Sequence, residues 1–94
     1  MNKFYVYMLV SISKNNLISY VGYTNNLKKR LILHNNSKGA RFTKGRKWTL
    51  AYSKLYDSKT IAMKEEYSLK HDIKKRKKLK NKFIKNENIN ITPL

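Results

Sequence analysis

Apolar side chains alternate along the first part of the chain in the pattern of a β-strand. Between Lys3 and Ser11 both alternating sets are apolar or aromatic, which predicts a central strand with both faces covered. The polar run SISKNN then supplies turn residues, and LISYVGY returns as a second strand. We therefore expect an antiparallel hairpin whose second strand ends at Gly22.

The next segment repeats its apolar residues with the period of a helix. Three inward positions recur at i, i+4 and i+7, namely Leu27, Leu31 and His34. This spacing predicts a helix capped by Thr24 or Asn25, with the imidazole of His34 turned inward. Arg30 lies within about 60° of the same direction, so its guanidinium is expected at the border of the buried stripe.

Residues 35–47 contain two glycines and five basic residues, a composition typical of an irregular loop. Its cations are the candidate contacts to nucleic-acid phosphates: Lys38, Arg41, Lys44, Arg46 and Lys47. Two aromatic side chains of this region, Phe42 and Trp48, either pack on the core or stack on bases. Trp48 to Tyr56 then forms a third predicted strand.

A second helix is predicted from Ser58 to Ile73, with Asp57 or Ser58 as its cap. Its inward stripe follows i, i+4, i+7 and i+11 and consists of Ala62, Glu66, Leu69 and Ile73. A carboxylate therefore occupies an inward position. The adjacent Glu65 points about 100° away and is expected in solvent, so the two glutamates are not equivalent.

The basic segment from Lys70 to Lys85 carries Leu79 and Phe83 at i and i+4, which predicts a terminal amphipathic helix over the core. Its cations form either a solvated face or a further phosphate contact. We expect one α+β domain over residues 1–85, and a frayed tail over 86–94.

Composition narrows the partner class. The 94 residues include 22 Lys plus Arg against five Asp plus Glu, for a net charge of +17. Such a surface requires a polyanion, and nucleic acid is favoured over an anionic membrane because no helix pairs a basic face with a broad apolar one. The absence of cysteine excludes disulfides and thiolate zinc sites and fits a reducing cytoplasm. No signal peptide or transmembrane helix is predicted.

Five inward or border groups are unusual choices for a small core: Tyr7, Tyr20, Arg30, His34 and Glu66. A carboxylate or guanidinium buried without a partner costs several kcal/mol, on the order of a small domain's whole stability. Each group must therefore be paired, hydrated in a cleft or bound to a metal. We expect these side chains to converge in one water-accessible pocket.

The order of the motifs resembles the GIY-YIG nuclease superfamily, and most closely its small free-standing, UPF0213-like branch. YVY at residues 5–7 stands in the place of the first tripeptide and YVG at residues 20–22 in the place of the second. TNNLKKRLILHN, SKGARFT and EEYSLK also match, so the resemblance covers roughly Lys3 to Lys70. The first tripeptide keeps only its tyrosine, and Tyr23 stands where some members carry lysine.

This resemblance implies a three-stranded antiparallel sheet flanked by helices, and phosphodiester hydrolysis assisted by one Mg²⁺ or Mn²⁺ ion. It assigns Glu66 as metal ligand, Arg30 as the clamp on the scissile phosphate, and Tyr7 and Tyr20 as the pair around the attacking water. Tyr7 is the expected general base, and His34 is either the competing base or its hydrogen-bond support. We expect the positive charge of Arg30 to ease ionisation of Tyr7. In the alternative reading, Glu66 forms a structural ion pair with Arg30 and binds no metal.

The sequence thus predicts a metal-dependent endonuclease that cleaves DNA with low sequence specificity and selects branched or single-stranded structure. Without a separate recognition domain, most contacts would go to the backbone. The alternative is a nucleic-acid-binding module of the same fold that lacks useful catalysis. DNA is favoured over RNA as the partner, and the sequence leaves the oligomeric state open.

Overall fold

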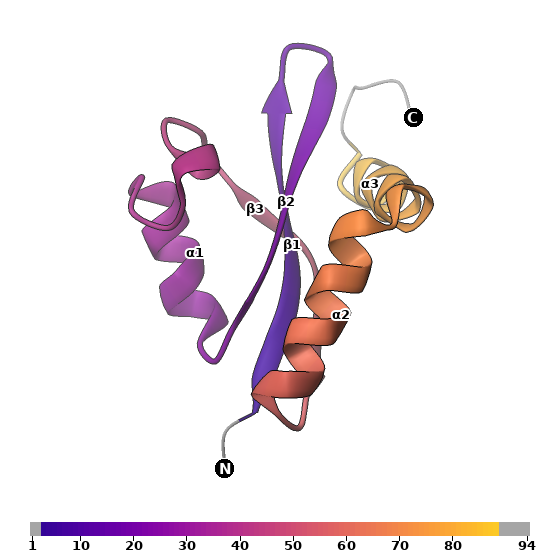
Figure 1. Cartoon of the computed structure of the whole chain (residues 1–94). Helices are drawn as coiled ribbons and strands as arrows, with labels where there is room; N and C mark the ends of the chain where they lie inside the picture. Colours follow the sequence, from indigo (N-terminus) through magenta and orange to yellow (C-terminus); the bar gives the residue numbers. More distant parts are fainter. Residues whose placement is uncertain (1–2, 89–94) are drawn as a thin grey trace.

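The computed structural model describes residues 3–88 and has an α+β fold, as the sequence predicted. Three strands, β1 (Phe4–Ser13), β2 (Asn16–Thr24) and β3 (Thr49–Tyr56), form one antiparallel sheet in the order β2-β1-β3. The other elements are α1 (Leu27–Asn35), the short 3₁₀ helix η1 (Arg41–Thr43), α2 (Lys59–His71) and α3 (Ile73–Asn86). Helix α1 lies on one side of the sheet, and α2 and α3 lie on the other (Figure 1).

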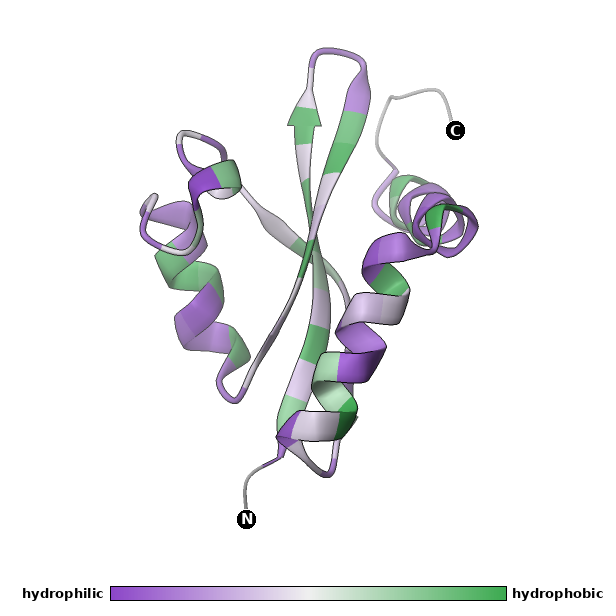
Figure 2. Ribbon diagram, in the orientation of Figure 1, coloured by the Kyte–Doolittle hydropathy of each residue, from purple (hydrophilic) through white to green (hydrophobic). Residues whose placement is uncertain are grey.

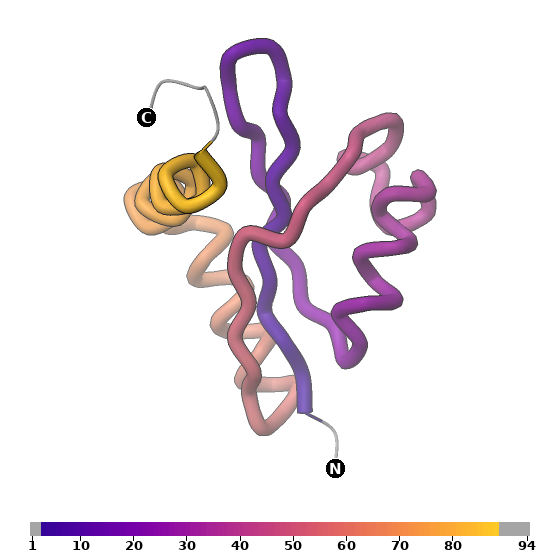
Figure 3. Tube along the Cα trace, turned by 180° about the vertical axis from the view of Figure 1, so that it is seen from behind, coloured from indigo at the N-terminus to yellow at the C-terminus, as the bar shows by residue number. Residues whose placement is uncertain are grey.

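Strand β1 is the central strand that its two apolar faces predicted. It pairs with β2 from Tyr5 opposite Thr24 to Ser13 opposite Asn16, which confirms the antiparallel hairpin. Strand β3 pairs with the other edge of β1, with an irregularity in register between Met8 and Leu9. Seen from behind, β3 lies in front of β1 (Figure 3). The turn that joins β1 and β2 projects beyond the part of the sheet that β3 covers.

The expectation that Gly22 ends the second strand is wrong. Gly22 pairs with Tyr7 inside β2, and the strand continues to Thr24. A Cβ atom at Gly22 would lie 2.5 Å from the hydroxyl oxygen of Tyr7, which is closer than real Cβ contacts allow. Glycine is therefore needed here for the close approach of a phenol ring and not for a turn.

The sheet separates two clusters of buried side chains. The cluster under α2 and α3 is aliphatic: Val6, Met8, Val10, Leu17, Val21, Ala62, Leu69 and Ile84. The cluster under α1 contains Tyr7, Leu9 and Trp48, with Ile18, Tyr20, Leu27 and Leu31 packed against it. Hydrophobic and hydrophilic segments are interspersed along the strands and along α2, whereas α3 is largely hydrophilic (Figure 2).

The helices differ from the predicted ones in three places, and at two of them, the start of α1 and the junction of α2 and α3, a polar side chain sets the boundary. Asn26, one residue later than expected, caps α1 by accepting a hydrogen bond from Lys29 N. The irregular loop contains η1. Helix α2 ends at His71 because Asp72 caps α3, so Ile73 starts a new helix and is 61% exposed instead of inward.

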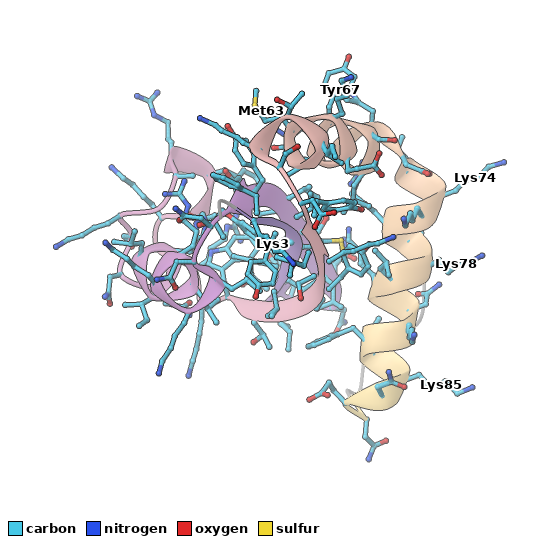
Figure 4. All side chains as sticks on the ribbon, turned by 90° about the horizontal axis from the view of Figure 1, so that it is seen from below. Lys3, Met63, Tyr67, Lys74, Lys78 and Lys85 are labelled. Atoms are coloured by element: carbon cyan, nitrogen blue, oxygen red, sulfur yellow. The ribbon has the colours of Figure 1, made fainter. Side chains whose placement is uncertain are left out.

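The last helix packs as expected. Leu79 and Phe83 are packed against the aliphatic cluster, and Ile84 is buried in it. Lys74, Lys78 and Lys85 point away from the body of the molecule (Figure 4). Of the predicted tail, Asn86 still belongs to α3, and residues 89–94 lie outside the described part of the chain. Within residues 3–88, no helix combines the length and apolarity that crossing a membrane demands.

Candidate active site

An open cleft of about 340 Å³ lies across the edge strand β2. Four of the five unusual side chains predicted from the sequence line it, namely Tyr7, Tyr20, Arg30 and Glu66. A larger hollow of about 550 Å³ near the end of the hairpin contains none of them. The structure therefore brings these four groups to one cleft, in which Tyr7 itself is only 1% exposed, while their chemical roles stay predictions.

Arg30 and Glu66 reach the same cleft from opposite sides of the sheet. Arg30 belongs to α1 and Glu66 to α2, and these helices cover opposite faces (Figure 1). Gly22, on the edge strand between them, also lines the cleft. Because Gly22 has no side chain, this edge of the sheet is open at the point where Tyr7 lies beneath it.

His34 does not line the cleft but lies behind Tyr7. It is the buried residue of α1, as the helical period predicted, and its exposed fraction is 0%. Its Nε2 atom is 2.9 Å from the hydroxyl oxygen of Tyr7, and the two rings meet edge to face. The ring of Tyr20 also packs on His34, with centroids 5.0 Å apart.

A chain of hydrogen bonds fixes the tautomer of His34. The hydroxyl of Thr43 donates its hydrogen to Ala40 O at 2.9 Å. The same oxygen, 2.9 Å from His34 Nδ1, must therefore accept, and Nδ1 carries the ring hydrogen. Nε2 is then an acceptor, so the hydroxyl of Tyr7 donates to it. His34 is consequently held as a neutral imidazole that can receive the proton of Tyr7.

Burial opposes ionisation of both members of this pair. Desolvation raises the pKa of Tyr7 above its ordinary value, and this effect outweighs the hydrogen bond and positive charge of Arg30, which lower it. Arg30 thus lowers the pKa of Tyr7, as expected, but burial raises that pKa by more. Burial, followed by the charge of Arg30, lowers the pKa of His34. The resting pair is therefore neutral at pH 7.

Arg30 is half-buried at the border of α1, as predicted, and has capacity to bind a ligand. Its Nε atom is buried and has no hydrogen-bond partner among residues 3–88. A guanidinium presents planar donors that match two oxygens of a phosphate. Since Arg30 lines the cleft, its guanidinium is suited to an oxyanion there.

The alternative reading, an ion pair between Glu66 and Arg30, is wrong. The carboxylate of Glu66 instead pairs with Lys70 Nζ at 3.2 Å, one helical turn away, and its side chain is 14% exposed. Glu65 is exposed, so the two glutamates differ as predicted. The described residues contain no cluster of three or more His, Cys, Asp or Glu that could hold a metal ion. One carboxylate in a hydrated cleft still fits Mg²⁺ or Mn²⁺, which retain water and phosphate oxygens as their other ligands.

Sequence reasoning missed three residues of the site. Thr43 lies in the loop, where no period reveals it, although it is fully buried beside His34. A Cβ atom at Gly39 would collide with His34 Nδ1, so Gly39 makes room for the imidazole as Gly22 does for the phenol. Lys59 lines the cleft and supplies a cation there. Its position seven residues before Glu66 on α2 could have identified it.

The five predicted loop cations are all exposed: Lys38, Arg41, Lys44, Arg46 and Lys47. The two aromatic side chains of this region differ in exposure. Trp48 is 2% exposed, packs in the core and donates from Nε1 to Thr43 O at 3.0 Å. Phe42 is 54% exposed.

The chain was compared with protein families, with individual proteins and with solved structures. Residues 3–82 match the sequence profile of the GIY-YIG catalytic domain. A UPF0213 protein of Staphylococcus saprophyticus is 41% identical over 81 residues, which is 85% of this chain and 94% of the relative. The UPF0213 protein YsiG of Lactococcus lactis is 40% identical over 89 residues, 90% of this chain and 83% of the relative. The solution NMR structure of a UPF0213 protein from Bacillus halodurans covers 96% of this chain and 99% of its own, with a TM-score of 0.48 and 28% identity.

Proposed function

Because the chain belongs to the GIY-YIG catalytic domain family, we propose that it is a metal-dependent endonuclease that hydrolyses phosphodiester bonds in DNA. The observation that supports this proposal is the single cleft shared by Tyr7, Tyr20, Arg30 and Glu66. It brings a guanidinium, a carboxylate and two phenols together, although the phenol of Tyr7 is only 1% exposed. Hydrolysis needs these groups together, since water must be activated while charge develops on the phosphoryl oxygens.

In this proposal Arg30 binds two oxygens of the scissile phosphate, and Tyr20 orients the attacking water. The new bond joins the water oxygen to phosphorus, and the bond from phosphorus to the leaving oxygen breaks. A charge-assisted contact from Arg30 strengthens as negative charge builds on the phosphoryl oxygens. Solvent in the open cleft supplies the proton that the leaving oxygen takes up.

Tyr7 is the proposed base, and His34 makes that role possible. Burial keeps Tyr7 protonated at rest, so its hydroxyl proton needs an acceptor before the oxygen can take one from water. His34 Nε2, 2.9 Å away, is that acceptor. As the water proton moves to Tyr7, the phenolic proton moves to His34. Tyr7 therefore stays neutral, and His34 becomes an imidazolium whose positive charge balances the negative charge that builds on the phosphoryl oxygens. Burial of His34 opposes this step.

Glu66 would hold the divalent cation, which when bound neutralises charge on the phosphoryl and leaving oxygens. For this the carboxylate must exchange its contact with Lys70, an exposed side chain whose ion pair contributes little. The exposed loop cations, none of which lines the cleft, would contact the nucleic-acid backbone beyond it and confer low sequence specificity. Competition between matched DNA and RNA strands tests the preference for DNA.

Nicking of supercoiled plasmid DNA with and without Mg²⁺ or Mn²⁺ tests the proposal. Glu66→Ala is expected to abolish nicking while leaving DNA binding intact, because only the carboxylate in the cleft is lost. Glu65→Ala is the matched control, since its side chain is exposed and outside the cleft. Equal nicking by the parent protein and Glu66→Ala would contradict the proposal.

One observation favours a second candidate, a nucleic-acid-binding module without useful catalysis. The carboxylate of Glu66 is already neutralised by Lys70. If that pair persists, DNA binding would be tight and salt-sensitive, but no metal would produce nicking. The same plasmid assay decides between the two candidates, with Lys70→Met as the variant that frees the carboxylate.

A further inference from the structure

Phe42 is the exposed aromatic residue of the basic loop. It is 54% exposed, whereas its neighbour Trp48 is 2% exposed. The ring contacts Tyr20 and Trp48, with centroids 6.3 and 6.1 Å away, but the rest of it is open to water, and cations precede and follow it in the loop. An exposed aromatic ring among cations is the combination with which proteins bind unpaired bases.

The loop does not need Phe42 to keep its shape. Asn35 and Trp48 hold its two ends together, because Trp48 N donates to Asn35 Oδ1 at 2.6 Å and Asn35 Nδ2 donates to Trp48 O at 3.1 Å. Thr43 anchors the middle to His34, and Gly45 N donates to Ser37 Oγ at 3.0 Å. These bonds fix the backbone around Phe42 without its side chain, and the exposed part of its ring remains open to a ligand.

The ring of Phe42 lies beside Tyr20, a residue of the cleft. It lies nearly parallel to the ring of Tyr20, with centroids 6.3 Å apart and planes 20° from parallel. Tyr20 itself lines the cleft. On the loop side, the guanidinium carbon of Arg46 stands 5.9 Å from the centroid of Phe42. A row of flat groups, Arg46, Phe42 and Tyr20, thus leads from the loop to the proposed scissile phosphate.

We infer that Phe42 is a stacking platform for an unpaired nucleobase next to the cleft, with Arg46 covering the base or its phosphate. The ring offers a face to any base, so the platform selects unpaired strand and not sequence. Bases inside a duplex stack on each other and are not available. The inference rests on the proposed function only in taking a nucleic acid as the ligand, and it names single-stranded or locally unpaired nucleic acid as the preferred substrate class.

Binding without catalysis tests the inference. Fluorescence anisotropy in the presence of EDTA compares a labelled oligothymidine with a blunt duplex of equal length. Phe42→Leu, which keeps an apolar side chain but removes the aromatic ring, is expected to weaken binding of the single strand by about 5- to 100-fold. Binding of the duplex should change by less than about twofold, because its contacts go to the backbone. Phe42→Trp should retain the affinity for the single strand.

Tyr67→Leu is the matched control, since Tyr67 is 65% exposed and lies on the outer face of α2, away from the cleft (Figure 4). It should leave both affinities unchanged. Equal weakening of single strand and duplex by Phe42→Leu, or no weakening of either, would overturn the inference.

A second measurement does not depend on a variant. Stacking on Phe42 should quench the fluorescence of 2-aminopurine in a single strand when the parent protein is added. Repeating the binding measurement with oligouridine in place of oligothymidine compares RNA with DNA. Unchanged fluorescence at saturation would also overturn the inference. Because no step requires cleavage, failure of the nicking assay would leave this result intact, and the reverse also holds.

Discussion

The two faces of the sheet are built from different chemistry. Under α2 and α3, the buried side chains are aliphatic and make no side-chain hydrogen bonds. Under α1, a tyrosine, a histidine and a threonine are buried together and hydrogen-bonded in series. Alternation along β1 sends Val6 and Met8 to the first face and Tyr7 to the second. One central strand therefore contributes to stability with one set of residues and to the proposed chemistry with the other.

Helix α2 is the element that belongs to both regions. Ala62 and Leu69 pack in the aliphatic cluster, while Lys59 and Glu66 line the cleft. The division between stability and chemistry can therefore be tested within one helix as well as between the two faces.

The largest expected effect is on catalysis and comes from Tyr7→Phe. Removing the proposed base should lower the nicking rate by about 10²- to 10⁴-fold. It also leaves His34 Nε2 buried without a donor, which should cost about 1–3 kcal/mol of unfolding free energy. Single-turnover nicking and urea unfolding measure the two effects. Tyr5→Phe, on the same strand but outside the cleft, is the control. A Tyr7→Phe protein that nicks at the parent rate would remove Tyr7 from the reaction.

The opposite profile is expected for Leu69→Ala in the aliphatic cluster. Loss of a buried leucine should cost about 2–5 kcal/mol of unfolding free energy. The nicking rate per folded molecule should stay at the parent value, because Leu69 lies outside the cleft. Urea unfolding and nicking at low temperature measure the two quantities. A lower rate in fully folded Leu69→Ala would mean that the two faces are coupled.

Thr43→Val should affect activity and stability together, each moderately. Valine keeps the shape but removes the oxygen that accepts from His34 Nδ1, so the tautomer with an accepting Nε2 is no longer favoured. We expect the nicking rate to fall by about 10-fold, and the unfolding free energy by about 1–3 kcal/mol. Thr43→Ser restores the acceptor and should recover most of the rate. Nitrogen NMR of the imidazole reports the tautomer directly, and an unchanged tautomer in Thr43→Val would disprove this role.

The smallest expected effect is a dependence of stability on pH that originates on the α1 face. Burial lowers the pKa of His34, so the unfolded chain binds a proton more readily than the folded protein does. Stability is therefore fully present above about pH 6.5, the ordinary histidine pKa, and is lost as pH falls toward the lower pKa of the folded state. Urea midpoints from pH 7.5 to 5 measure this. His34→Gln should flatten the curve; a His34→Gln protein whose stability falls with pH as steeply as that of the parent would contradict the assignment.

The two regions also differed in how far the sequence could predict them. Periodicity located the strands, the helices and the inward positions of His34 and Glu66, since burial of one face repeats along a regular element. It failed where single residues decide. Asp72 ends α2 by capping the next helix, and Gly22 continues a strand in which glycine usually signals a break. The contact between Thr43 and His34 could not be predicted, because it depends on the fold of an irregular loop that has no sequence period.

Gly22 and Gly39 give the hydrogen-bonded pair a particular evolutionary constraint. Each lacks the Cβ atom that would collide with Tyr7 or His34. Neither position can accept even alanine while the two rings keep their present places. A substitution of Gly22 would require a smaller side chain in place of Tyr7, and a substitution of Gly39 would require one in place of His34. The two glycines and the two rings are therefore expected to change together. The two rings of the proposed catalytic dyad thus occupy the space beside these glycines, and any larger residue there would displace them.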